Sequence, residues 1–139
     1  MASEATAHDR PRVVVIDDEP NMGKVLTKIL RLDGFGVQAF DSPLSATEHL
    51  KEHGAEVVLT DLRMPEMNGE EVLQFVRNQD IRCEVILMTA YGTVESAMRC
   101  VRQGAYDYVT KPFDTKGLVA TVRKAEEKRL REMPPPPRS

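Results

Sequence analysis

The sequence predicts an α/β fold in which a five-stranded parallel sheet is doubly wound, with five helices covering its two faces. Short apolar runs of strand length recur along the chain, and each is followed by an amphipathic helical pattern. The first of these runs, RVVVI at 12–16, is continuously apolar and rich in β-branched residues, which is typical of a strand buried on both faces. Because strands and helices alternate, the sheet should be parallel.

Composition bounds the class of protein. A chain of 139 residues has the size of one ordinary domain, and 41% hydrophobic with 29% charged residues is typical of a soluble globular protein. The net charge of −3 argues against general nucleic-acid binding. The polar N-terminus lacks the apolar core of a signal peptide, and Cys83 and Cys100 lack the spacing of a metal site. We therefore expect a cytoplasmic protein with reduced thiols and no contact with a membrane.

The first half of the chain predicts two strands and two helices after the strand at 12–16. Residues 21–33 form a helix that Gly34 can end, and its apolar stripe consists of Met22, Val25, Leu26, Ile29 and Leu30. FGVQAF at 35–40 alternates as a second strand. Asp41 or Ser42 can cap the next helix, which ends before Gly54. Residues 57–60 then form the third strand.

The second half repeats this pattern. Asn68 can cap the third helix, residues 84–88 form the fourth strand, and residues 106–109 form the fifth. The fourth helix, at about 93–103, presents Val94, Ala97, Met98 and Val101. Asp114 can cap the last helix, whose inward residues are Leu118, Val119, Val122 and Ala125. We expect residues 1–10 to be a disordered leader, 11–131 to be one domain, and 132–139, with four prolines, to be an extended tail or the start of a linker.

Polar residues stand at the carboxyl ends of four of the five predicted strands. Asp17 and Asp18 follow the first strand, Asp61 the third, Thr89 the fourth and Lys111 the fifth. In a doubly wound sheet of order 2-1-3-4-5, the first and third strands are neighbours, about 4.8 Å apart, and flank the point where the winding reverses. Each of these residues alone is common in a turn or a helix cap. Because all five lie at the same edge of the predicted sheet, however, they predict a binding site.

The chemistry of these residues suits a phosphoryl group. Carboxylates crowded together repel one another, and a divalent cation relieves that repulsion. Mg²⁺ suits a site with few carboxylates because it keeps positions for water and phosphate oxygens. Lys111 supplies a positive charge and Thr89 a hydroxyl donor, so the set is suited to positioning and neutralising a phosphoryl group.

Four motifs resemble a known family. VVVIDDEP, LTDLRMPEMNG, ILMTAYG and YDYVTKPF are similar to the receiver domains of two-component response regulators, over about residues 11–131. The resemblance implies a flavodoxin/CheY-like fold. The stretch AYGTVESAMRCVRQGAYDYVTKPF is most similar to receivers of the NtrC type, which control ATP-dependent transcription activators. Transcription regulation is therefore the expected process.

The resemblance also implies roles for the acidic residues. Asp61 would be the phosphoacceptor, taking a phosphoryl group from a histidine of a sensor kinase or phosphotransfer protein. Asp18 and Asp61 would bind Mg²⁺ directly together with the backbone carbonyl of Arg63, while Asp17 would act largely through water. Self-phosphorylation and self-dephosphorylation would be the only enzymatic activities of such a domain.

The signal would leave the site through a second set of residues. By resemblance, Thr89 and Lys111 contact the phosphoryl oxygens, Tyr108 is the switch aromatic, and Lys111 precedes Pro112 in a cis peptide. The face built from the helix at 93–103, the strand at 106–109 and the last helix would repack, and it could also form a homodimer or hold an output domain. The receiver itself would not contact nucleic acid. Arg63 and Tyr91 occupy positions that tune the lifetime of the phosphorylated state in this family.

Two alternatives remain open at this point. Phosphatases of the haloacid dehalogenase type use similar residues, but they need a second Asp two residues after the nucleophile, where this chain has Arg63. Arginine cannot be deprotonated at ordinary pH and so cannot act as that general acid. The other alternative is an interaction domain that keeps the fold and is never phosphorylated.

Overall fold

A computed structural model of the chain describes residues 12–90 and 93–132. The predicted leader, nearly all of the proline-rich tail and Tyr91 lie outside these ranges. The strands are β1 (Arg12–Ile16), β2 (Gly36–Phe40), β3 (Val57–Asp61), β4 (Glu84–Ala90) and β5 (Asp107–Lys111). The helices are α2 (Pro20–Leu32), α3 (Pro43–His53), α4 (Gly69–Asn78), α5 (Val94–Arg102) and α6 (Thr115–Glu132).

The five strands form one sheet in the order β2-β1-β3-β4-β5, and every neighbouring pair is parallel. The predicted fold class and strand order are therefore confirmed. Ile16 pairs with Thr60, so the residues that follow, Asp17 and Asp61, lie side by side at the carboxyl edge of the sheet. The register of the sheet thus brings together residues that are far apart in the chain.

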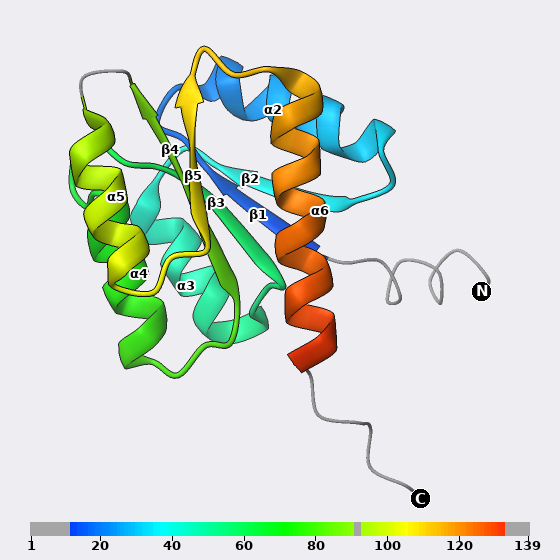
Figure 1. Cartoon of the computed structure of the whole chain (residues 1–139). Helices are drawn as coiled ribbons and strands as arrows, with labels where there is room; N and C mark the ends of the chain where they lie inside the picture. The colour runs from blue at the N-terminus through cyan, green and yellow to red at the C-terminus, as the bar shows by residue number, and fades with distance from the viewer. Residues whose placement is uncertain (1–11, 91–92, 133–139) are drawn as a thin grey trace, which may run out of the picture.

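Helices cover both faces of the sheet (Figure 1), with α2 and α6 on one side and α3, α4 and α5 on the other. Side chains alternate along β1, so that Val13 and Val15 enter one core cluster while Val14 and Ile16 enter the other. The central strands are apolar on both faces because both faces are buried. Among the described residues, no helix is both long enough and apolar enough to pass through a bilayer.

Three helices are capped by residues that the sequence predicts as caps. The Ser42 side chain accepts a hydrogen bond from the Ser45 amide at 3.3 Å, and Asn68 forms a reciprocal capping box with Glu71. Asp114 Oδ2 accepts a hydrogen bond from the Gly117 amide at 2.9 Å. Each of these caps satisfies an amide that has no partner inside its helix.

Two details of the prediction were wrong. Val25 and Met98 were expected on the inward stripes of their helices, but they are 49% and 44% exposed. Each apolar stripe is wider than the contact between its helix and the sheet, so the margin remains in solvent. The last two strands are also longer than their apolar runs, because Thr89 pairs with Thr110 and Ala90 with Lys111. Backbone pairing needs no apolar side chain, so it continues to the carboxyl edge.

Gly69 allows α4 to begin directly against the end of β3. Its amide donates to the Leu62 carbonyl at 2.8 Å, and the Leu62 amide donates to the Met88 carbonyl at 2.9 Å. A Cβ at Gly69 would lie 2.7 Å from both the Asp61 carbonyl oxygen and Leu87 Cδ1. The loop between β3 and α4 is therefore closed by an approach that only glycine permits.

We expect Gly69→Ala to destabilise the domain by about 1–3 kcal/mol, because the added methyl group forces α4 away from Asp61. Chemical denaturation followed by circular dichroism measures the change. Gly23→Ala is the matched control, since a Cβ there would make an ordinary 3.5 Å contact with Ala39. That control should be neutral or stabilising because alanine favours the interior of α2. Equal stability of Gly69→Ala and the wild type would contradict the packing argument.

Candidate functional site

Three acids meet at the carboxyl edge of β1 and β3. Asp17 is buried, with 1% of its surface exposed, whereas Asp18 is exposed and Asp61 is half-buried. One carboxylate oxygen from each lies within 4.8 Å of the others. The structure thus brings together the three acids that the sequence placed on one edge. Carboxylate oxygens at this separation are suitable ligands for a hard divalent cation such as Mg²⁺.

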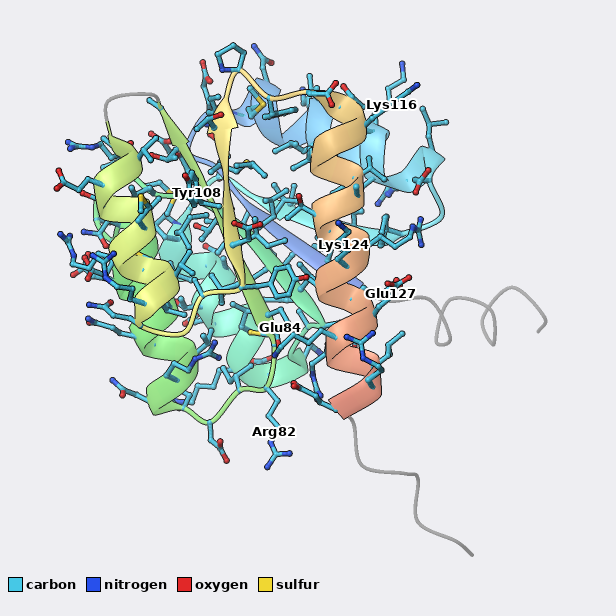
Figure 2. All side chains as sticks on the ribbon, in the orientation of Figure 1. Arg82, Glu84, Tyr108, Lys116, Lys124 and Glu127 are labelled. Atoms are coloured by element: carbon cyan, nitrogen blue, oxygen red, sulfur yellow. The ribbon has the colours of Figure 1, made fainter. Side chains whose placement is uncertain are left out.

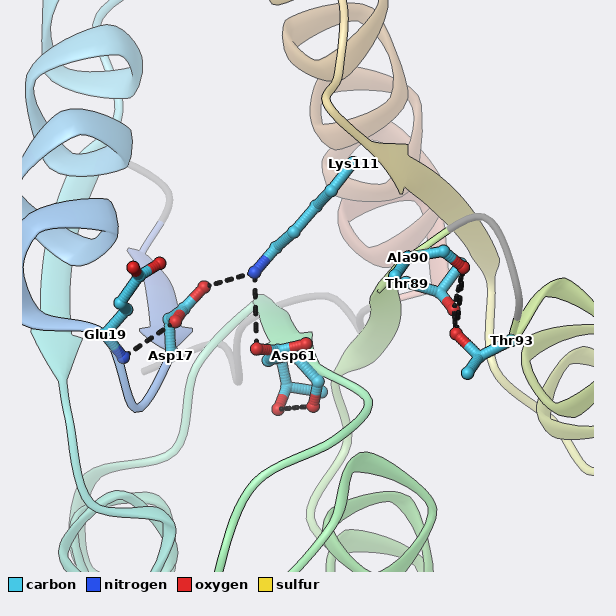
Figure 3. Close-up of polar contacts among 8 residues, drawn as sticks. Asp17, Glu19, Asp61, Thr89, Ala90, Thr93 and Lys111 are labelled. Carbon is cyan, nitrogen blue, oxygen red and sulfur yellow. Dashed lines mark hydrogen bonds and ion pairs between the residues drawn. The ribbon is translucent and has the colours of Figure 1, made fainter.

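Lys111 connects the acids from the end of β5 (Figure 3). Its Nζ lies 2.8 Å from Asp17 Oδ2 and 3.2 Å from Asp61 Oδ2. The second oxygen of Asp17, Oδ1, accepts a hydrogen bond from the Glu19 amide at 2.9 Å. Both oxygens of Asp17 are thus engaged by protein groups, which fixes its carboxylate in one orientation.

Burial and charge oppose each other in setting the pKa values of this site. Burial raises the pKa of Asp61 and the nearby Asp17 carboxylate adds to the rise, while Lys111 and the backbone of Arg63 counteract it. Burial alone would lower the pKa of Lys111, but its hydrogen bond to Asp17 and the two carboxylate charges outweigh burial and raise it. Lys111 therefore stays protonated. The charged form of Asp61 is disfavoured because burial removes part of its hydration.

Thr89 is fully buried near the end of β4, and its hydroxyl is engaged away from the carboxylates (Figure 3). The hydroxyl lies 3.1 Å from the Ala90 carbonyl and contacts the hydroxyl of Thr93. Thr93 belongs to none of the site motifs that the sequence predicts. The only sequence signal for it is a threonine directly before a helical pattern.

The remaining predicted residues surround this centre. Tyr108 is half-buried on β5 and packs against the core cluster that contains Ala97 and Cys100 of α5 (Figure 2). Arg63 has an exposed side chain in the loop after β3. Tyr91 lies outside the described residues. The peptide between Lys111 and Pro112 is cis, as expected.

The fold and the site together define the class of protein. The molecule is a doubly wound α/β domain whose acidic site, bridged by a lysine, lies where the winding of the sheet reverses. Open sheets of this kind bind their ligands at this point.

Comparison with known proteins then gives the family. A family model described as the response regulator receiver domain matches residues 13–123. The regulatory protein AtoC of Escherichia coli is 40% identical over 114 residues, covering 82% of this chain and 25% of AtoC. The NtrC regulator of Proteus hauseri is 33% identical over 113 residues, covering 81% and 24%. A crystal structure of a receiver domain protein from Clostridium thermocellum superimposes with a TM-score of 0.84 at 26% identity, covering 88% of this chain and 99% of that one.

This chain belongs to the response regulator receiver domain family. Its relatives include transcriptional regulators of the NtrC type, and it spans about a quarter of the length of those that it matches. Receiver domains generally bind Mg²⁺ at an acidic cluster and take phosphoryl groups from sensor kinases. The chain is therefore a regulatory domain rather than a typical enzyme.

The raised pKa of Asp61 predicts a specific dependence of stability on pH. Below its ordinary value of 3.8, Asp61 is protonated in both the folded and unfolded states. As the pH rises through the higher folded pKa, the unfolded state loses this proton more readily, and stability falls. Without divalent cations, Asp61→Asn should therefore be more stable than the wild type at pH 7, and the two should converge in acid.

Urea denaturation of both proteins across a pH series measures this difference. Asp41→Asn is the matched control, because it makes the same substitution at an exposed aspartate. An Asp61→Asn protein that is less stable than the wild type at pH 7 would show that Lys111 outweighs burial at this site.

Proposed function

We propose that this domain is the phosphoacceptor switch of a two-component system and that Asp61 receives the phosphoryl group. The observation that supports this most is the position of Asp61, where the acidic cluster and the Nζ of Lys111 converge. Asp61 ends β3, so the sheet fixes the direction of its carboxylate while 16% of the side chain remains exposed. A phosphodonor can therefore reach an oxygen whose orientation is already set.

The transfer forms an acyl phosphate. A carboxylate oxygen of Asp61 bonds to the phosphorus of a phosphohistidine, and the bond between phosphorus and the histidine nitrogen breaks. The electron pair remains on that nitrogen, and water supplies a proton to it. The donor is a sensor histidine kinase or a phosphotransfer protein.

The three acids are not equally suited to bind Mg²⁺ directly. Asp18 and Asp61 would ligate the ion directly, joined by the backbone carbonyl of Arg63. Both oxygens of Asp17 are already engaged, by Lys111 and by the Glu19 amide, which favours a contact through water for this residue. The ion would supply positive charge that neutralises the phosphoryl oxygens during transfer.

Lys111 and Thr89 would then hold the transferred group. The Nζ of Lys111 is already 3.2 Å from Asp61 Oδ2, so a small movement reaches a phosphoryl oxygen. The Thr89 hydroxyl has to leave Ala90 and Thr93 before it can donate to the same group. The phosphoryl group thus changes the hydrogen bonding of a residue that is buried in the resting state.

The output would be carried by the face built from α5, β5 and α6. Movement of Thr89 makes room for Tyr108 to turn inward, and this repacks the face against a partner, an output domain or a second copy. Relatives such as AtoC and NtrC are named as regulators, so we propose control of transcription through a separate output module. The receiver contributes no nucleic-acid contact of its own, and we place it in the cytoplasm.

The phosphodonor needs a surface beside the site, and α2 offers one. Val25 and Leu32 are 49% and 81% exposed on this helix, which begins two residues after Asp18. The two residues are seven positions apart on one face of α2, and an exposed apolar face that runs away from a reactive centre suits contact with a partner. We propose that the donor protein packs there while its phosphohistidine reaches Asp61.

Intact mass spectrometry tests the proposed function directly. Incubation with Mg²⁺ and a small acyl-phosphate donor should add one phosphoryl group to the wild type and to Asp41→Asn, and none to Asp61→Asn. Mild base should remove the group because acyl phosphates hydrolyse readily. An unmodified wild type would favour the interaction-domain alternative, and modification of Asp61→Asn would place the phosphoacceptor elsewhere.

The side chain of Arg63 should prolong the phosphorylated state by obstructing water near Asp61. We expect Arg63→Ala to lose its phosphoryl group several-fold faster, measured as the decay of the phosphorylated mass after removal of the donor. Tyr91 should act in the same way. Arg82→Ala is the control, since Arg82 is exposed at the opposite end of the sheet (Figure 2). An unchanged rate in Arg63→Ala would contradict this role.

A further inference from the structure

Thr93 stands at the start of α5 in a position where threonine normally caps a helix. Ser42 and Asn68 hold the equivalent place before α3 and α4, and both of their side chains accept a hydrogen bond from an amide of the first turn. The Thr93 side chain makes no such bond. Its backbone also differs, with φ −121° and ψ 19°, whereas Asn68 has the extended φ −87° and ψ 174° that suit a cap.

The hydroxyl of Thr93 is instead turned back to the end of β4 (Figure 3). It donates to the Ala90 carbonyl at 2.9 Å and contacts the hydroxyl of Thr89. A hydroxyl has one proton and two acceptor positions. The Thr89 hydroxyl lies within hydrogen-bond distance of the same Ala90 carbonyl, at 3.1 Å, as well as of Thr93, so the single proton of Thr89 is engaged away from Asp61.

We propose that Thr93 is a positioning residue whose hydroxyl has two alternative partners. In the resting state it is held at the Ala90 carbonyl and the Thr89 hydroxyl, and it leaves the first turn of α5 without a side-chain cap. When Thr89 turns to a phosphoryl oxygen, the Thr93 hydroxyl loses that partner, and its side chain can turn to accept a hydrogen bond from an amide of α5, that of Ser96 in the usual geometry. This inference rests on the proposed function, because it needs a phosphoryl group on Asp61.

The consequence is a direct link between the site and one helix of the output face. Phosphorylation exchanges one hydrogen bond of Thr93 for another, so the cost of releasing Thr89 is offset by a new cap. The first amides of a helix have no partner inside the helix, so a cap restrains the turn that it covers. The first turn of α5 therefore becomes more ordered as Thr89 moves, and this biases the packing of α5 against β5.

Amide hydrogen exchange measured by nuclear magnetic resonance tests this link. The full chain is compared with and without Mg²⁺ and beryllofluoride, which resembles a bound phosphoryl group. In the wild type, beryllofluoride should slow exchange of the Ser96 amide about fivefold, the effect of one helix cap. The Ser45 amide, which Ser42 already caps, serves as the internal control and should not change.

Two variants separate the cap from a general effect on structure. Thr93→Val keeps the shape of the side chain but removes the hydroxyl, so the slowing at Ser96 should disappear. Thr93→Ser keeps the hydroxyl and should restore it. In both variants, beryllofluoride should still shift the amide signals of Asp18, Asp61 and Lys111.

Three results would count against the proposal. Equal slowing at Ser96 in Thr93→Val and the wild type would overturn it, as would no slowing in a wild type whose Asp61 signal responds. If beryllofluoride shifts no signal at Asp18, Asp61 or Lys111, the proposed function fails, and this inference fails with it.

Discussion

The ion pairs of Lys111 with Asp17 and Asp61 are the interaction on which the architecture of the site depends. They join the end of β5 to the ends of β1 and β3, at 2.8 Å and 3.2 Å. Without a positive charge, three carboxylates this close would repel one another and separate. A buried charge left without its partner is strongly destabilising. The lysine therefore keeps the acids converged, in the arrangement that a divalent cation can enter.

The fold supplies the rigid frame for this balance of charges. Parallel register sets Asp17 beside Asp61, and the glycine at position 69 brings the first turn of α4 against the carbonyl of Asp61. Both faces of the sheet are covered, so the strand ends cannot shift without disturbing a packed core. In the proposed switch, the hydroxyls of Thr89 and Thr93 and the side chain of Tyr108 change partners while the backbone of the sheet stays in place.

Most of the fold could be predicted from the sequence because the strand patterns, the helix patterns and the helix caps all indicated the same elements. Apolar β-branched runs marked the strands, while Ser42, Asn68 and Asp114 marked helix starts. The five polar residues at the strand ends followed from topology alone. The exposure of Val25 and Met98 could not be predicted, because it depends on how much of each helix the sheet covers. The sequence also could not show that Thr93 leaves α5 uncapped, since a threonine that does cap a helix occupies the same place in the sequence.

A crystal structure with Mn²⁺ in place of Mg²⁺, with the metal located by its anomalous signal, would show whether the three acids hold one ion. We expect one metal among Asp17, Asp18 and Asp61, with oxygens of Asp18 and Asp61 at about 2.1 Å. Lys111 should remain beside the carboxylates. A metal bound elsewhere, or acids that separate when the ion is present, would contradict the account.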